Sequence, residues 1–146
     1  MTKYISIDPG KCKCGLILAD FQSKRVLEAI VIESKYLVQN IQTFTEKDKN
    51  IKVLIGNGTT SHKHAKSLSF LDNNLTIVEE KNTTYRSRQR YFEIFPVKGI
   101  KRFLPRDIFL QNINLDAISA LVILEDYLNC KFTLNCDRLS KTWMKQ

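Results

Sequence analysis

The chain has 146 residues, 43% of them hydrophobic, which is enough for one buried core but too few for a second domain of ordinary size. We therefore expect a single domain over residues 1–146. The sequence has no apolar run long enough to span a bilayer and no basic, then apolar start typical of a signal peptide, so we expect a cytoplasmic protein without a membrane partner. Its net charge of +8 favours an acidic partner such as nucleic acid.

The chain opens with three short segments rich in branched residues, which predict three strands. These segments are residues 3–8, 14–19 and 25–32. The first ends on Asp8, and alternation places Asp8 on the same face as Tyr4 and Ser6, opposite Ile5 and Ile7. An acid at the end of a strand can hold a metal ion or orient a phosphate. The alternative is that Asp8 only begins the turn at Pro9.

The middle of the chain alternates between helical and strand-like patterns. Apolar residues at helical spacing predict a helix over 35–47, followed by short strands over 53–55 and 75–78. Gly56-Asn57-Gly58 closes the first of these strands, and Thr59, Thr60 and Ser61 can cap a helix that follows. This segment either turns backbone N–H groups toward a phosphate or is a plain turn from strand to helix. The second strand ends on Glu79 and Glu80.

The last third predicts a helix over 82–95 capped by Asn82 or Thr83, an irregular basic loop over 96–105, and a final helix over 115–128. Asp116 lies in the first turn of the final helix, where an acid also favours the helix dipole. The order of the elements predicts an α/β fold with a mixed five-stranded sheet and helices on both faces.

Three acids from distant parts of the chain thus each stand at the end of an element. They are Asp8, either Glu79 or Glu80, and Asp116. Carboxylate oxygens are the ligands that Mg²⁺ and Mn²⁺ prefer, and a pair of such ions can cleave a phosphodiester bond. Neighbouring residues of a strand point to opposite faces, so only one of the two glutamates belongs to this group, and we favour Glu80.

Nearly all of the net charge lies between residues 81 and 106, where eight basic residues accompany one acid, Glu93. Aromatic residues are interleaved with these cations, and this combination favours binding to phosphates and bases. The alternative is a solvated basic face whose aromatic residues belong to the core. We expect phosphate contacts from Lys11, Lys81, Arg86, Arg88, Arg90, Lys98, Lys101 and Arg102.

The cysteines and histidines carry weaker signals. Cys12, Cys14, Cys130 and Cys136 lack the spacing of zinc knuckles, so we expect free thiols, with a zinc site as the alternative. His62 and His64 diverge on a short helix, and we interpret both as exposed polar residues.

Four groups of residues, in this order over nearly the whole chain, resemble the YqgF family, the RuvC-like branch of the RNase H-like nucleases. They are Ile7-Asp8-Pro9-Gly10-Lys11 with Lys13-Cys14-Gly15; Ile55-Gly56-Asn57-Gly58-Thr59-Thr60-Ser61; Glu79-Glu80-Lys81-Asn82-Thr83-Thr84 with Arg88, Arg90 and Tyr91; and Leu115-Asp116-Ala117-Ile118-Ser119-Ala120 with Ile123-Leu124-Glu125. Lys81 stands where the family has an arginine, which keeps the charge but loses a bidentate phosphate contact.

The resemblance implies an RNase H-like fold and a nuclease that uses Mg²⁺ or Mn²⁺, with Asp8, Glu80 and Asp116 as its acids. Members of the family are described as Holliday junction resolvases or as nucleases that process pre-16S ribosomal RNA. Ser119 stands one helical turn after Asp116, where RuvC-type resolvases have a further acid, so we expect RNA processing by a monomer or weak homodimer. A resolvase of branched DNA and a non-catalytic nucleic-acid-binding module are the alternatives.

Overall fold

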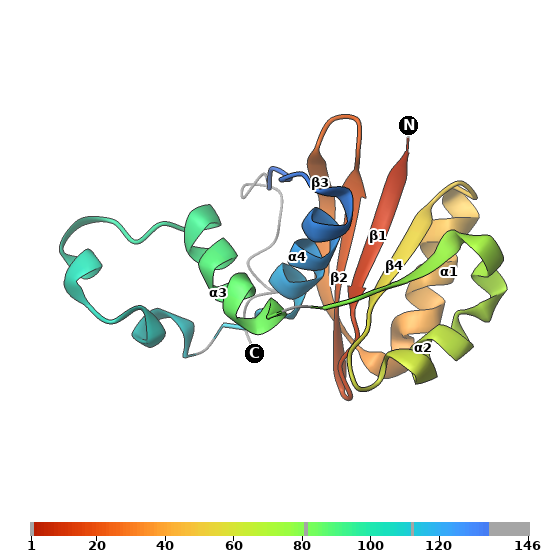
Figure 1. Cartoon of the computed structure of the whole chain (residues 1–146), viewed down its shortest axis with the longest axis horizontal. Coiled ribbons are helices and arrows are strands. Elements are labelled where there is room, and N and C mark those ends of the chain that lie inside the picture. The colour runs from red at the N-terminus through yellow and green to blue at the C-terminus, as the bar shows by residue number, and fades with distance from the viewer. Residues whose placement is uncertain (1, 81, 112, 135–146) are drawn as a thin grey trace.

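The computed structural model describes residues 2–80, 82–111 and 113–134, and its centre is a five-stranded sheet (Figure 1). The strands are β1 (Lys3–Asp8), β2 (Lys13–Asp20), β3 (Arg25–Glu33), β4 (Lys52–Gly56) and β5 (Leu75–Val78). They lie in the order β3-β2-β1-β4-β5, with β2 antiparallel to β1 and β3, and β4 parallel to β1 and β5. The predicted mixed sheet is confirmed, and its order and strand directions are those of an RNase H-like fold.

Helices cover both faces of the sheet, as predicted. The α-helices are α1 (Leu37–Lys47), α2 (Ser61–Ser67), α3 (Thr83–Ile94) and α4 (Asp116–Leu128). Short 3₁₀ helices cover Ser34–Tyr36, Ser69–Asn74, Gly99–Phe103 and Arg106–Leu110. One apolar core contains residues of α1 and the segment that follows α2, and the other contains residues of α4. Among the described residues, no helix combines the length and the apolar character needed to cross a bilayer.

The central strand β1 divides its side chains between these two cores. Ile5 and Ile7 are fully buried in the core with α1, whereas Tyr4 packs in the core with α4. Asp8 has the same parity as Tyr4, so its side chain lies on the α4 side of the sheet. The predicted alternation along this strand is confirmed.

The helix α4 is buried along most of its length. Nine consecutive residues, Ala117 to Glu125, are buried, and α4 contacts β1, β2 and α3. A helix enclosed on several sides is apolar over most of its surface, which explains why this segment shows only a weak amphipathic pattern. Its enclosure fixes the position of its first residue, Asp116, against the sheet.

Two predicted helix caps are wrong. The Thr60 hydroxyl does not cap α2 but donates a hydrogen bond to the carbonyl oxygen of Pro9, at 2.9 Å. Asn82 precedes α3 in the left-handed region, with φ of 55°, and makes no side-chain cap bond. In both cases a tertiary or backbone requirement overrides the local preference of the side chain.

The thiols of Cys12, Cys14 and Cys130 are free, as predicted. Cys14 is buried, and Cys12 is exposed. Cys136 lies outside the described residues, and so does Lys81.

Candidate active site

Asp8 lies at the end of β1, opposite Gly15 of β2 and on the side of the sheet that α4 covers. Burial raises the pKa of its carboxyl group from 3.8 to about 7, with further contributions from the nearby carboxylates of Glu80 and Asp116 and an opposing hydrogen bond from Ser119. The dispersed acids of the sequence are therefore close enough to act on one another electrostatically. Burial of like charges without a cation is unfavourable, and such groups mark candidate functional sites.

Gly15 brings Asp116 to this place. A Cβ atom at Gly15 would overlap the backbone carbonyl of Asp116, so the first turn of α4 can lie against β2 only because this residue has no side chain. The Asn114 side chain accepts a hydrogen bond from the Asp116 backbone N–H at 2.9 Å, which holds the start of the helix. Burial raises the pKa of Asp116, while hydrogen bonding from Asn114 and the charge of Lys13 oppose the rise.

Gly56 plays the same part for Glu80. A Cβ atom at Gly56 would overlap Oε1 of Glu80, and a Cβ atom at Gly58 would lie 3.7 Å from the same oxygen. The segment that the sequence offered as a phosphate-binding turn therefore forms a recess for a carboxylate. Glu79 is exposed, whereas Glu80 is partly buried and acts on Asp8.

The Glu80 carboxylate is incompletely satisfied in this recess. Its Oε1 atom is buried and has no hydrogen-bond partner within the described part of the chain, and burial raises the pKa of the group. A divalent cation would satisfy this oxygen and relieve the repulsion around Asp8. The donor set is all oxygen, which suits Mg²⁺ or Mn²⁺.

The described residues nevertheless contain no group of three His, Cys, Asp or Glu side chains already arranged around one ion position. Asp8, Glu80 and Asp116 share one end of the sheet, but their carboxylates are not drawn together as a finished coordination shell. The same finding gives no support to a zinc site at the cysteines within residues 2–80, 82–111 and 113–134.

Two serines that sequence reasoning did not place in the site connect Asp8 to α3. The Ser119 hydroxyl donates a hydrogen bond to Asp8, and its oxygen lies 2.9 Å from the Ser87 hydroxyl in a buried contact. Ser87 is also 2.6 Å from the carbonyl oxygen of Thr83, in the first turn of α3. Ser119 could have been found by its position one turn after Asp116, but Ser87 has no signal in the sequence.

The loop after Asp8 is held by side chains from three other segments. Thr60 donates to Pro9, the Ser34 hydroxyl donates to the Gly10 carbonyl at 3.0 Å, and His64 Nε2 lies 3.2 Å from the same carbonyl. His64 is therefore partly buried against this loop, and its predicted full exposure is wrong; His62 is exposed, as predicted. These contacts fix the backbone that carries Asp8 out of the strand.

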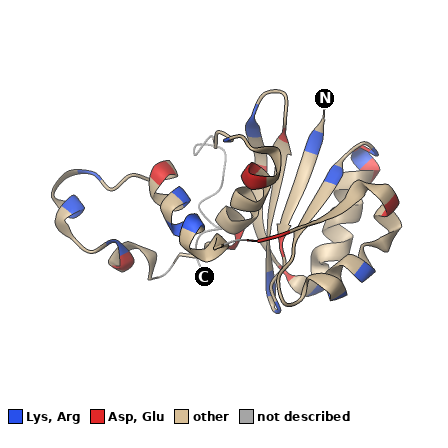
Figure 2. Cartoon of the chain, viewed as in Figure 1, with Lys and Arg blue, Asp and Glu red and all other residues tan. Residues whose placement is uncertain are grey.

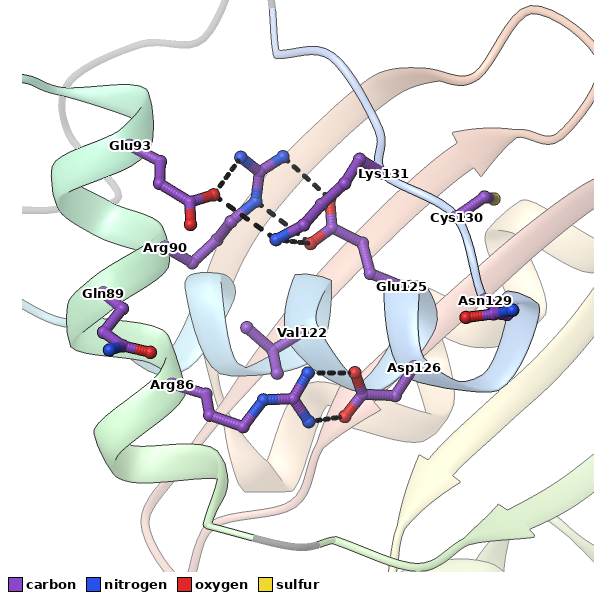
Figure 3. Close-up of a pocket in the computed structure, with 10 residues that line it drawn as sticks. All are labelled: Arg86, Gln89, Arg90, Glu93, Val122, Glu125, Asp126, Asn129, Cys130 and Lys131. Atoms are coloured by element: carbon purple, nitrogen blue, oxygen red, sulfur yellow. Dashed lines mark hydrogen bonds and ion pairs between the residues drawn. The ribbon is translucent and has the colours of Figure 1, made fainter.

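The basic residues expected to contact phosphate fall into two groups (Figure 2). Lys11, Arg88, Lys98, Lys101 and Arg102 are exposed, although Arg88 lies 3.6 Å from Asp107. Arg86 and Arg90, in contrast, point from α3 toward acids of α4 (Figure 3).

Arg86 makes a two-pronged ion pair with Asp126, and Arg90 bonds Glu125 at 2.7 Å and the Phe132 carbonyl at 2.8 Å (Figure 3). The Glu125 side chain is only 5% exposed, so its charge depends on this partner. The cavity of about 480 Å³ at this place is lined by groups that pair with one another. Both arginines hold α3 against α4 in the structure, and their predicted contact with phosphate stays a prediction.

Neither a protein-family model nor a curated protein matches this chain. Among solved structures it is similar to RuvC of T. thermophilus in complex with Holliday junction substrate. That alignment covers 91% of this chain and 100% of the other, with 10% sequence identity and a TM-score of 0.46. Likeness of this degree carries no argument about activity, and membership in the YqgF family stays an interpretation of the sequence motifs.

Proposed function

We propose that this chain is a metal-dependent nuclease that hydrolyses phosphodiester bonds in structured RNA, with the 5′-end processing of pre-16S ribosomal RNA as its reaction in the cell. The observation that carries the proposal is the convergence of Asp8, Glu80 and Asp116 at one end of the sheet, where two of these acids raise the pKa of the third. Repulsion among carboxylates costs stability that a purely structural role would not require.

In this proposal Asp8, Glu80 and Asp116 hold Mg²⁺ or Mn²⁺. The metal supplies an activated water molecule and stabilises the oxygen that leaves. Gly15 and Gly56 allow the close approach of two of the ligands, and the Ser119 hydroxyl orients the third. The exposed cations near the site hold the phosphate backbone of the substrate.

A nuclease of branched DNA is the second candidate. It is less favoured because Ser119 bonds Ser87 at the position where a further acid is expected in a resolvase, so the structure uses this place for a neutral hydrogen-bond network. A non-catalytic RNase H-like binding module is the third candidate, and the missing ready-made coordination shell favours it.

Cleavage assays with a precursor-type RNA and a four-way DNA junction, each in Mg²⁺ and in Mn²⁺, test the proposal. We expect the RNA to be cut faster, and we expect Asp8→Asn to lose activity by a factor of a hundred or more while it keeps RNA binding. Asp72→Asn, which neutralises an exposed carboxylate after α2, is the matched control and should keep full activity.

Calorimetric titration with Mn²⁺ adds a readout that does not depend on turnover. Wild type and Asp72→Asn should bind the ion alike, and Asp8→Asn should bind it at least tenfold more weakly. Symmetric nicks in the junction with intact RNA would favour the second candidate, and tight binding without cleavage of either substrate would favour the third.

A further inference from the structure

The segment between α3 and α4, residues 96–111, extends away from the sheet and is here called the arm (Figure 1). Its first 3₁₀ helix, Gly99–Phe103, carries two of the most exposed apolar side chains in the described part of the chain. Ile100 is 87% exposed and Phe103 is 89% exposed. Large apolar side chains held this far into solvent are typical of a contact surface.

The two side chains form one ridge. Residues three apart in a 3₁₀ helix lie one above the other, so Ile100 and Phe103 share a face. Lys101 and Arg102 come between them in the sequence and therefore lie on the adjoining faces, and both are exposed. The tip of the arm thus presents a narrow apolar ridge with positive charge beside it.

We propose that this apolar ridge packs against unpaired bases of a nucleic-acid strand while the neighbouring cations contact its phosphates. The inference rests on the proposed function for its ligand class. Bases offer flat apolar faces of the size of one or two side chains, and the backbone that joins them supplies the opposite charge.

Other partners fit this surface less well. A stable protein interface buries about 800 Å² on each partner, far more than two side chains provide. A membrane-bound helix needs an apolar face that continues over several turns, whereas the 3₁₀ helix of the arm ends at Phe103. A second copy of this chain would bring another positive arm against the first.

The position of the arm relative to the acids gives the contact a register. Helix α3 begins shortly after Glu80 and has 12 residues, so it carries the chain about 18 Å from the candidate site at about 1.5 Å per residue. This length corresponds to about five nucleotides of a stacked strand at about 3.4 Å each. The ridge would therefore contact bases about five nucleotides from the bond that the acids face.

Fluorescence titrations in EDTA test this inference, because binding is then measured without cleavage. The probe is a short single-stranded RNA with one internal 2-aminopurine, compared with single-stranded DNA of the same sequence. We expect Phe103→Ala to weaken binding about tenfold and to lose the fluorescence change that stacking causes, with the salt dependence unchanged. Arg102→Gln should instead reduce the log–log salt slope by about 0.7.

Phe70→Ala is the matched control, since Phe70 is 43% exposed in the 3₁₀ helix after α2, remote from the arm. It should bind both oligonucleotides as wild type does. Equal affinity and equal fluorescence for wild type and Phe103→Ala would overturn the inference, and so would binding to anionic vesicles or self-association that depends on Phe103 in place of oligonucleotide binding.

The failure of the proposed function gives a different result. If wild type binds the probe through Phe103 but never cleaves RNA in Mg²⁺ or Mn²⁺, the nuclease proposal is rejected and the arm contact is supported. A preference of the ridge for RNA or for DNA then identifies the natural strand.

Discussion

Asp8 combines a position suited to metal binding with a cost in stability. Its pKa is about 7 in the folded chain and 3.8 as an isolated group, so between these values the folded form holds a proton that the unfolded chain has lost. The free energy of unfolding therefore falls as pH rises from about 4 to about 7, and the stabilisation is fully present only below about pH 4.

From this we predict that, without divalent ions, Asp8→Asn is more stable than wild type at pH 8, by on the order of 2 kcal/mol, because asparagine carries no charge to bury. The advantage should shrink toward pH 4. Urea unfolding in EDTA at both pH values measures it. A variant that is equally destabilised at both pH values would show that Asp8 is held by interactions of its ionised form.

Gly56 and Gly15 permit different kinds of close approach, so their alanine variants should differ. At Gly56 the added Cβ meets the flexible end of Glu80, and it lies 2.8 Å from Cδ1 of Ile123. We expect Gly56→Ala to cost about 1–3 kcal/mol and to weaken Mn²⁺ binding at least tenfold, because the Glu80 carboxylate must leave its recess.

At Gly15 the added Cβ meets the backbone of Asp116, which cannot move without α4. Gly15→Ala should therefore lower the free energy of unfolding more than Gly56→Ala does. Denaturant unfolding and calorimetry with Mn²⁺ separate the two effects. Unchanged Mn²⁺ affinity in a folded Gly56→Ala variant would remove Glu80 from the candidate metal ligands.

At the scale of elements, the contact between α3 and α4 depends on a nearly buried ion pair. Arg90→Gln would leave the Glu125 carboxylate, 5% exposed, with Lys131 at 3.6 Å as its closest charged partner. We predict a loss of about 3–5 kcal/mol in the free energy of unfolding.

Arg88→Gln is the matched control for this prediction, because Arg88 and its partner Asp107 are 52% and 86% exposed. It should change the free energy of unfolding by less than about 1 kcal/mol. Thermal and urea unfolding of both variants provide the measurement. Similar small effects would mean that the helix pair is held by its apolar contacts alone.

The same contact shows where sequence reasoning about an element reaches its limit. Arg86 and Arg90 lie four residues apart on one face of α3, and this spacing alone suggested that both address one phosphate backbone. Their partners Asp126 and Glu125 are 40 and 35 residues further along the chain. Only the packing of α3 against α4 reveals that the shared face meets carboxylates.

At the scale of the whole molecule, the uneven distribution of charge should govern binding. The arm carries four exposed cations, Lys98, Lys101, Arg102 and Arg106. If each contacts a phosphate of a single strand, the log–log slope of affinity against salt should be about −3, at about −0.7 for each contact.

Replacing these four residues with glutamine should bring the slope close to zero, since Arg86 and Arg90 already have carboxylate partners. Fluorescence anisotropy of a labelled RNA over a series of salt concentrations measures the slope. A steep slope that survives the fourfold substitution would place the binding surface elsewhere, with Lys11 as the next candidate.

The sequence by itself determined those features that depend on local order along the chain. Alternation in Lys3–Asp8 was enough to place Asp8 apart from Ile5 and Ile7, because neighbouring residues of a strand must face opposite ways. The strand and helix patterns were enough for the mixed sheet, and the ends of elements were enough to single out Asp8 and Asp116.

Only the tertiary structure decided which groups meet. It selected Glu80 over Glu79 as the neighbour of Asp8, because Gly56 on another strand leaves room for its carboxylate. It joined Ser87 to Ser119, and it gave Thr60 and His64 to the loop after Asp8. These contacts arise from packing between segments that are distant in the chain, and local sequence preferences carry no information about such distances.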